Sequence, residues 1–277
     1  MERRLTITVP ANQAGTSLLD YLAQRFTYLS RSRWQEELAF GRLLLNGVSA
    51  PPQAMLAPGD QLVYQPSPSA LQEPAVAIDY CILHEDDHLL VVDKPAPLPC
   101  HPGGRFFAHT LWALLREQQG LARPSFVNRL DRETSGIVLV AKSPEVARVC
   151  QEQFLAGSVE KEYLVLVEGE AGFAEQDAEG WLAPDSASLV RKKIRFVPSG
   201  EAAPFGGAVC ATALRRLAVG HGLSLLAALP RTGRCHQIRA TLLGLGLPVV
   251  GDKLYGRDET IFLRFMDDRL SETDWAV

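Results

Sequence analysis

The first part of the chain carries apolar residues at helical spacing and predicts two helices. One covers about residues 18–26, and a second covers about 32–40. Ser32 and Gln35 have the spacing of a capping box, and Gly41 suits the residue that stops the second helix. With the short strands that follow, these helices form a unit that is barely large enough to fold alone.

Short apolar runs replace the helical pattern further along the chain and predict strands. Residues 43–45 precede the turn pair Asn46-Gly47, and another short strand is expected at 61–64. Residues 65–75 contain three Pro and two Ser without periodicity, which is typical of a semi-extended linker. Beyond it, many strands with few helices predict a mixed, mostly antiparallel α+β fold. The expected strands are 77–83, 88–92, 136–141, 163–167 and 223–229, and the expected helices are 109–119, 144–155 and 235–244.

Composition supports a globular protein and a reducing compartment. The 277 residues are 47% hydrophobic and 22% charged, which excludes intrinsic disorder and collagen. The five Cys are odd in number and scattered, as reduced thiols of a cytoplasmic protein are. The N-terminus has two Arg but no apolar leader segment, and the longest near-apolar run, Leu242–Val250, is far shorter than a membrane span of about 20 residues. We therefore expect a cytoplasmic protein without a membrane partner.

Charge is distributed unevenly although the net charge is only −4. Residues 182–239 carry nine Lys or Arg against two acids, a net charge of +7, whereas residues 67–181 carry nine basic and 18 acidic residues. Such an asymmetry is expected if one face contacts a polyanion. It is equally expected of solvated strands whose charges are balanced by acids elsewhere in the fold, and charge alone does not decide between the two.

Several common catalytic motifs lack support in this sequence. His84–His88 spells H-E-x-x-H, but a zinc site needs this string within a helix, and here it lies between two strand-like runs with an acidic centre. We interpret it as a hairpin turn. The sequence contains no phosphate-binding P-loop, no G-x-G-x-x-G and no G-x-S-x-G, so nucleotide-triphosphate and serine-hydrolase chemistry lose their usual support.

A polar stretch before the strand expected at 136–141 holds a candidate catalytic carboxylate. Asp131 stands between Arg129 and Arg132, and neighbouring guanidinium groups favour the ionised form that a nucleophile or base requires. The alternative is an Asp that hydrogen-bonds within its own turn, helped by Thr134 and Ser135. The residues alone favour this second interpretation.

Two further stretches combine residues that suit phosphate or carboxylate partners. Residues 231–239 hold three Arg together with His236 and Gln237, a set that can clamp phosphates or orient a carboxylate, or form ion pairs at a helix start. Tyr163 opens an apolar strand, and by itself such a Tyr is usually a core residue.

Taken in order, these strings resemble the RNA pseudouridine synthases of the branch with the R-L-D-x-x-T-S-G signature. Residues 15–64 also resemble the S4 RNA-binding module that often precedes this catalytic domain. The resemblance implies an S4-like domain at 1–65, a linker at 66–76 and a catalytic domain at 77–277. The matching strings are Val91–Pro95, His101-Pro102, Arg129–Gly136, Lys161–Leu164, Arg231–Arg239 and Gly251–Gly256, and in the module Arg31–Arg33, Gly41–Gly47 and Pro58–Asp60.

The resemblance implies an enzyme that isomerises uridines in structured RNA by flipping the nucleotide into a cleft. Asp131 would be the catalytic carboxylate, Tyr163 would pack on the target base, and Arg239 would be the basic partner of the carboxylate. Asp131 would attack C1′ or C6, or remove the 2′ proton, and the sequence does not choose between these. No metal, nucleotide or redox cofactor is needed. Expected RNA contacts are Arg129, which would fill the gap left by the flipped nucleotide, and Arg31, Arg33, Arg42, Lys192, Arg234 and His236.

Two departures from the family pattern and two rival functions accompany this interpretation. Asn128 stands where the family usually has His, which argues against a proton-carrying role there. Relatives commonly continue past the position of residue 277, so a last edge strand is in doubt or the sequence is truncated. The rivals are a non-catalytic RNA-binding or ribosome-assembly protein and a nucleoside hydrolase. We expect a monomer whose substrate is ribosomal RNA rather than transfer RNA.

Overall fold

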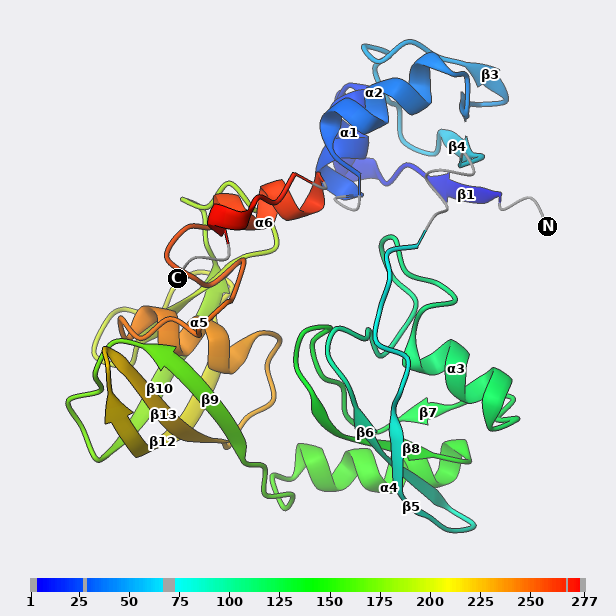
Figure 1. Cartoon of the computed structure of the whole chain (residues 1–277). Coiled ribbons are helices and arrows are strands. Elements are labelled where there is room, and N and C mark those ends of the chain that lie inside the picture. The colour runs from blue at the N-terminus through cyan, green and yellow to red at the C-terminus, as the bar shows by residue number, and fades with distance from the viewer. Residues whose placement is uncertain (1–3, 27–28, 67–72, 268, 275–277) are drawn as a thin grey trace. The chain divides into compact units, whose positions relative to one another are not determined.

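In the computed structural model, the chain folds into two compact units, Met1–Gln151 and Glu152–Val277 (Figure 1). The structure describes residues 4–26, 29–66, 73–267 and 269–274. The predicted boundaries of an S4-like domain, a linker and a catalytic domain stay predictions, and residues 67–72 of the predicted linker lie outside the described residues.

The N-terminal part of the first unit is a small antiparallel sheet with two helices that lie side by side (Figure 1). The sheet has the strand order β1-β4-β2-β3, and its apolar residues pack with those of the helices into one core. Trp34 and Tyr64 lie at the centre of this core, with ring centroids 5.1 Å apart. The elements are β1 (Leu5–Thr8), η1 (Ala11–Gln13), α1 (Leu18–Arg25), α2 (Arg31–Ala39), β2 (Leu43–Leu45), β3 (Val48–Ser49) and β4 (Gln61–Tyr64).

The start of α2 differs from the prediction, whereas its end agrees. Ser30, not Ser32, caps the helix, because the Ser30 hydroxyl accepts a hydrogen bond from the Arg33 amide. The predicted capping box of Ser32 and Gln35 is therefore wrong. Gly41 has a φ of 67° and its amide donates to Leu38, which confirms it as the helix stop.

The rest of the first unit is a four-stranded antiparallel sheet in the order β5-β6-β8-β7. Leu111 and Leu115 of α3 pack with Leu90 and Val138 of the sheet. The strand expected at 77–83 begins only at Cys81, where pairing with β6 starts. The elements are β5 (Cys81–Glu85), β6 (Leu89–Lys94), α3 (Leu111–Gln118), β7 (Ser125–Phe126) and β8 (Gly136–Ala141), followed by α4 (Pro144–Leu155), which ends in the second unit.

The H-E-x-x-H string is the hairpin turn between β5 and β6, as predicted. The Asp86 carboxylate accepts hydrogen bonds from the amides of His88 and Leu89, both at 2.7 Å, and closes the turn. Within the described ranges, no group of three or more His, Cys, Asp or Glu side chains is placed to hold a metal ion.

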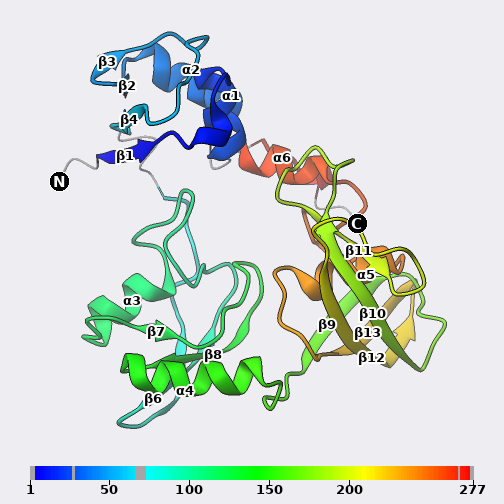
Figure 2. The ribbon, with the colours of Figure 1, turned by 180° about the vertical axis from the view of Figure 1, so that it is seen from behind.

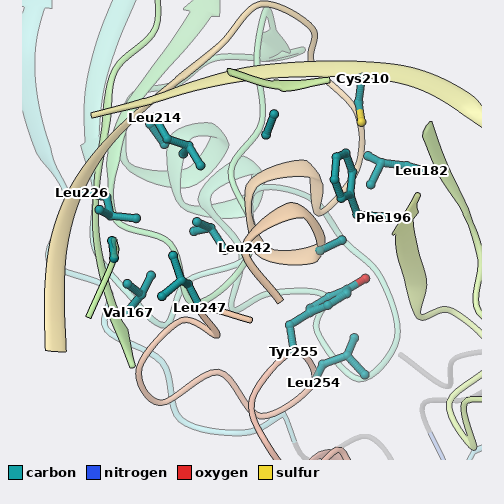
Figure 3. Packing of buried hydrophobic residues seen from close by; sticks show 14 of the residues in the cluster. Val167, Leu182, Phe196, Cys210, Leu214, Leu226, Leu242, Leu247, Leu254 and Tyr255 are labelled. Carbon is teal, nitrogen blue, oxygen red and sulfur yellow. The ribbon is translucent and has the colours of Figure 1, made fainter. Parts of the chain in front are cut away.

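The second unit is a five-stranded antiparallel sheet in the order β11-β10-β12-β13-β9, with α5 against one face (Figure 2). Figure 3 shows Leu242 of α5 pointing into a cluster to which every strand of the sheet contributes. The cluster accounts for the apolar alternation on this face of the strands. The elements are β9 (Tyr163–Glu168), β10 (Glu175–Pro184), β11 (Ile194–Pro198), β12 (Ala208–Gly220), β13 (Leu223–Pro230), α5 (Gln237–Gly244), α6 (Thr260–Met266) and η2 (Glu272–Asp274).

The architecture confirms the predicted α+β class with mostly antiparallel sheets. None of the helices in the described part of the chain is both long and apolar enough to cross a membrane.

Candidate active site

Asp131 lies in the loop that connects β7 to β8. The loop closes a turn through its main chain, because the Thr134 amide donates to the Asp131 carbonyl oxygen at 3.1 Å. Gly136 ends the loop with a φ of 121°, a conformation that side-chain-bearing residues rarely adopt, and then starts β8. The main chain of Asp131 thus closes the turn, and the residue is half-buried.

A fully buried lysine side chain holds the Asp131 loop through hydrogen bonds to main-chain carbonyl oxygens. Lys94, the last residue of β6, donates from Nζ to the carbonyl oxygens of Leu98 at 2.8 Å, Pro95 at 2.9 Å and Arg132 at 3.3 Å. The Arg132 carbonyl also accepts from the Leu98 amide at 2.9 Å. Burial lowers the pKa of Lys94 to about 8, although the nearby Asp131 carboxylate opposes this shift. The ammonium group therefore fixes the residue next to Asp131 through its main chain.

Two more side chains hold the start of the loop. The buried Cys100 thiol lies 3.4 Å from the Leu130 carbonyl oxygen and 3.5 Å from the Leu130 amide, and burial raises its thiol pKa. The His101 ring packs against the Phe126 ring at a tilt of 52°, with centroids 4.4 Å apart, and burial together with Arg129 lowers the pKa of His101. A neutral thiol and a neutral imidazole therefore line the loop.

The two arginines beside Asp131 differ in their surroundings. Arg129 is exposed. The Arg132 guanidinium pairs with Glu133 and lies over the Phe106 ring, 5.2 Å from its centroid. Arg132 is thus held by its own loop and by the segment before α3, while Arg129 is accessible to solvent.

In the second unit, Arg239 on α5 is held by a buried carboxylate. Its Nε and Nη2 donate to the two Asp252 oxygens at 2.6 and 2.8 Å, and its guanidinium carbon lies 4.8 Å from the Tyr255 ring centroid. The amides of Leu254 and Tyr255 also donate to Asp252. Although burial opposes ionisation, these bonds keep the pKa of Asp252 below its usual range. The orientation of Arg239 is therefore fixed within its own unit.

Hydrogen bonds of Gln237 and Tyr255 hold the loop before α5. The Gln237 side chain accepts from the Thr232 hydroxyl and the Arg234 amide, and it donates to the main chain of β12. His236 has a φ of 52°, and its Nδ1 lies 2.9 Å from the Tyr255 hydroxyl, which also accepts from the Ile194 amide. Burial raises the pKa of Tyr255, so this phenol remains protonated.

The other predicted site residues of the second unit lie on its sheet and hairpins. Tyr163 is the first residue of β9, opposite Ala228, and packs against the hydrophobic cluster. Arg234 is exposed, and its Nε donates to the Val209 carbonyl oxygen. The Lys192 ammonium lies 4.3 Å from the Phe262 ring centroid.

The three arginines of the N-terminal part that were predicted to contact RNA each have an acidic neighbour. Arg31 pairs with Asp20 at 2.5 Å, and Arg42 pairs with Glu37 at 2.6 Å. Arg33 pairs with Glu36 at 2.8 Å. The pairs of Arg31 and Arg33 are exposed and weak enough to exchange for other anions, whereas Glu37, the partner of Arg42, is buried.

The charge surplus of residues 182–239 is partly balanced by acids from outside that segment. Balance by acids elsewhere in the fold was one of the two interpretations that the sequence left open. Four of the nine basic residues form ion pairs with such acids. The pairs are Lys193 with Glu259, Arg215 with Glu162, Arg231 with Asp177 and Glu179, and Arg239 with Asp252.

Within each unit, the structure brings some predicted residues together and adds others. It places Arg129 and Asp131 on one loop, and Arg234, His236 and Arg239 around the start of α5. Sequence reasoning did not single out Lys94 or Asp252 for a role. Both occur in strings that carried the family resemblance, Asp93-Lys94-Pro95 and Gly251-Asp252-Lys253, which was the available signal.

Comparison with known proteins identifies the family. The profile of the family described as RNA pseudouridylate synthase matches residues 88–243. Ribosomal large subunit pseudouridine synthase D of Nitrosomonas europaea is 33% identical over 262 residues, which cover 92% of this chain and 73% of the relative. The protein of the same name from Xanthomonas campestris pv. campestris is 36% identical over 260 residues, 90% of this chain and 73% of the relative. The mitochondrial tRNA pseudouridine(32) synthase of Saccharomyces cerevisiae is 29% identical over 243 residues, 87% of this chain and 51% of the relative.

Solved structures agree with this assignment. Human RNA Pseudouridylate Synthase Domain Containing 1 is similar with a TM-score of 0.56 and 26% identity over 68% of this chain and 74% of that one. Human RNA Pseudouridylate Synthase Domain Containing 4 is similar with a TM-score of 0.52 and 26% identity over 64% and 69%. Since the family profile covers more than half of the chain and relatives above 30% identity align with about nine-tenths of it, the chain belongs to the RNA pseudouridylate synthase family and is an enzyme that isomerises uridine in RNA.

Proposed function

We propose that Asp131 is the catalytic carboxylate of this isomerase and that Tyr163 and Arg239 act on the same uridine. The observation that carries the proposal is the support of the Asp131 loop: a buried ammonium group, Lys94, and a thiol, Cys100, hold its main chain. A reacting carboxylate must be held within a fraction of an ångström, and bonds to the backbone achieve this without engaging the carboxylate.

The reaction breaks the N1–C1′ bond, turns the uracil and joins C5 to C1′. The carboxylate attacks C1′ or C6, or removes the 2′ proton, and N1 gains a proton while C5 loses one. Tyr163, at the start of β9, supplies a ring for the uracil to stack on. Arg239, already oriented by Asp252, supplies a fixed positive charge for the carboxylate. Arg129 is exposed on the same loop as Asp131 and fills the gap that the flipped nucleotide leaves.

The Asp131 assignment is tested by Asp131→Asn in tritium release from RNA labelled at C5 of uridine. We expect the wild type to release tritium and the variant to lose at least about 10³-fold in rate, because a neutral amide is neither nucleophile nor base. Glu133→Gln, on the same loop, is the matched control and keeps activity. An Asp131→Asn variant with wild-type release would remove Asp131 from the mechanism, and a wild type without release would reject this catalytic proposal.

For the substrate, we propose structured RNA, with ribosomal RNA favoured over transfer RNA. Two relatives above 30% identity are named as ribosomal large subunit enzymes, whereas the mitochondrial tRNA enzyme is 29% identical. Pseudouridine mapping of ribosomal and transfer RNA from cells that lack this protein tests the choice. Loss of a site in transfer RNA with all ribosomal sites intact would overturn it.

We propose further that residues 1–65 are an S4-like module that contacts RNA phosphates through Arg31, Arg33 and Arg42. The exposed ion pairs of Arg31 and Arg33 leave both guanidinium groups near solvent, and Arg42 lies over the exposed Phe40 ring at 4.7 Å. Replacing all three by Gln is expected to raise KM for RNA and to flatten its salt dependence with little change in kcat. We also propose that the enzyme acts as a cytoplasmic monomer.

A further inference from the structure

The residue that departs from the family pattern, Asn128, occupies an unusual place beside β8. The main chain of β7 pairs with β8 through Phe126 and Val140, and the Val127 amide still donates to the Leu139 carbonyl oxygen at 2.8 Å. One residue later the main chain has left the sheet. At the next positions along the edge of β8, the main-chain groups form hydrogen bonds with a side chain.

That side chain is the Asn128 amide, which makes two hydrogen bonds to the β8 main chain. Its Oδ1 accepts from the Leu139 amide at 2.8 Å, and its Nδ2 donates to the Ile137 carbonyl oxygen at 3.1 Å. A carboxamide presents one acceptor and one donor side by side, as a peptide group in a strand does. The side chain of Asn128 therefore continues the ladder of β7 after its backbone has turned away.

Because a side chain takes the place of the main chain here, the chain can leave the sheet at Asn128. Without a partner, Leu139 N–H and Ile137 C=O would favour continued strand pairing, since unpaired backbone groups at a partly buried edge cost free energy. Continued pairing would draw residues 128–130 along the edge of β8. The Asn128 amide satisfies both groups, so the chain leaves the sheet three residues before Asp131, where the turn closed by the Thr134 amide begins.

We propose that Asn128 is a positioning residue, whose carboxamide caps the edge of β8 and thereby sets where the Asp131 loop leaves the sheet. The inference rests on the proposed role of Asp131. It assigns to Asn128 a function in the geometry of the reaction and none in proton transfer, since a carboxamide does not titrate.

Three variants separate this role from simple stability. Asn128→Asp keeps the acceptor for Leu139 but turns a second acceptor toward the Ile137 carbonyl. Asn128→Leu removes both bonds, and Asn128→His supplies one donor and one acceptor at pH 8, where an ordinary imidazole is neutral. Ser125→Ala is the matched control, because Ser125 is in β7 and its hydroxyl donates only locally, to the Arg123 carbonyl oxygen.

In tritium release under steady-state conditions, Asn128→Asp and Asn128→Leu are expected to lower kcat by about 10-fold to 100-fold, because small misplacements of a catalytic group have effects of this size. KM for RNA should stay within about threefold, as binding surfaces are unaltered. Asn128→His should recover most of kcat, and Ser125→Ala should behave as the wild type. Wild-type kcat in Asn128→Asp, or a raised KM with unchanged kcat in Asn128→Leu, overturns the proposal.

Amide hydrogen exchange supplies a readout that does not depend on activity. In Asn128→Leu, the amides of Leu139 and Thr134 should exchange at least about 10-fold faster, while the Val127 amide stays protected as an internal measure of folding. In Asn128→Asp, Leu139 should remain protected. An unchanged Thr134 amide in Asn128→Leu shows that Asn128 does not position the loop. A wild type without tritium release would instead reject the catalytic role of Asp131 and leave the exchange result to decide on Asn128.

Discussion

Each unit of the molecule buries a lysine, and the two are stabilised in different ways. Lys94, beneath the Asp131 loop, is fully buried and donates to three main-chain carbonyl oxygens. Lys193, in the second unit, pairs with the Glu259 carboxylate at 2.8 Å. Glu259 also accepts from the Ser188 hydroxyl and the Leu189 amide, so this ion pair ties the β10–β11 connection to the residues before α6.

The difference shows how a fold can hold a positive charge near the carboxylate that we propose to be catalytic. A salt bridge fixes Lys193, and another fixes Arg239 to Asp252, where each partner has a counter-charge. Carbonyl dipoles satisfy Lys94 without a second carboxylate beside Asp131. The cost is visible in its pKa, which burial lowers to about 8, because dipoles compensate less of the lost hydration than a full counter-charge does.

The largest effect is expected from Lys94→Met. Three carbonyl groups lose their donor, and the free energy of unfolding should fall by about 2–4 kcal/mol. Tritium release should fall as well, because the Arg132 carbonyl beside Asp131 loses its anchor. Urea unfolding measures the first effect. Lys142→Met is the control, since Lys142 pairs with the exposed Glu85 and its loss should cost less than about 1 kcal/mol. Equal losses in the two variants would contradict this view of Lys94.

A somewhat smaller loss is expected from Asp252→Asn, which breaks the ion pair of Arg239. The buried Asp252 accepts four hydrogen bonds, and removal of its charge should cost about 2–3 kcal/mol in urea unfolding. Asp258→Asn, at an exposed pair with Arg264, provides the comparison and should cost less than about 1 kcal/mol. If kcat is unaffected in folded Asp252→Asn, the orientation of Arg239 does not matter to the reaction.

A double-mutant cycle of Lys193→Met and Glu259→Gln should show coupling of about 1–2 kcal/mol, since the residues are in contact and nearly buried. The same cycle for Lys94→Met and Asp131→Asn should show weaker coupling in stability, because Lys94 is held by carbonyl oxygens. Coupling of equal size in both cycles would remove the distinction between the two lysines.

The smallest effect is the contribution of Lys94 to the pH dependence of stability. Its pKa is about 8 in the folded chain and 10.5 for an ordinary lysine, so below pH 8 the group is protonated in both states. Between these values the unfolded chain binds more protons, and stability therefore rises with pH. Relative to Lys94→Met, the wild type should gain about 1 kcal/mol between pH 8 and pH 9. A constant difference across this range would argue that Lys94 has an ordinary pKa.

The strands that could be predicted are those with a local signal. The run 136–141 is rich in β-branched residues and forms β8 with the predicted bounds, and 144–155 likewise forms α4 as predicted. The strands β10 and β12 were missed. They are rich in Ala, Gly and charged residues, and β12 has a composition closer to that of a helix, so only their pairing with neighbouring strands makes them extended.

In the candidate site, too, some residues carry a local sequence signal and others do not. Asp131, Arg239 and Tyr163 were found through short strings that resemble the family. Their supports, Lys94 and Asp252, gave no functional signal, because a Lys at the end of a strand and an Asp in a turn have many ordinary roles. Asn128 was noticed only as a departure from the family pattern, and its two bonds to β8 were not foreseen.

The sequence alone determined the family and the α+β class and supplied the candidate site residues, since these depend on local patterns and on motifs that are contiguous in the chain. Tertiary structure decided which backbone groups Lys94 and Asn128 satisfy and which carboxylate holds Arg239. Those partners lie 1, 4 and 38 residues away for Lys94, 9 and 11 for Asn128, and 13 for Arg239. Contacts of that kind are selected by the packing of whole strands and helices, and local sequence patterns do not encode them.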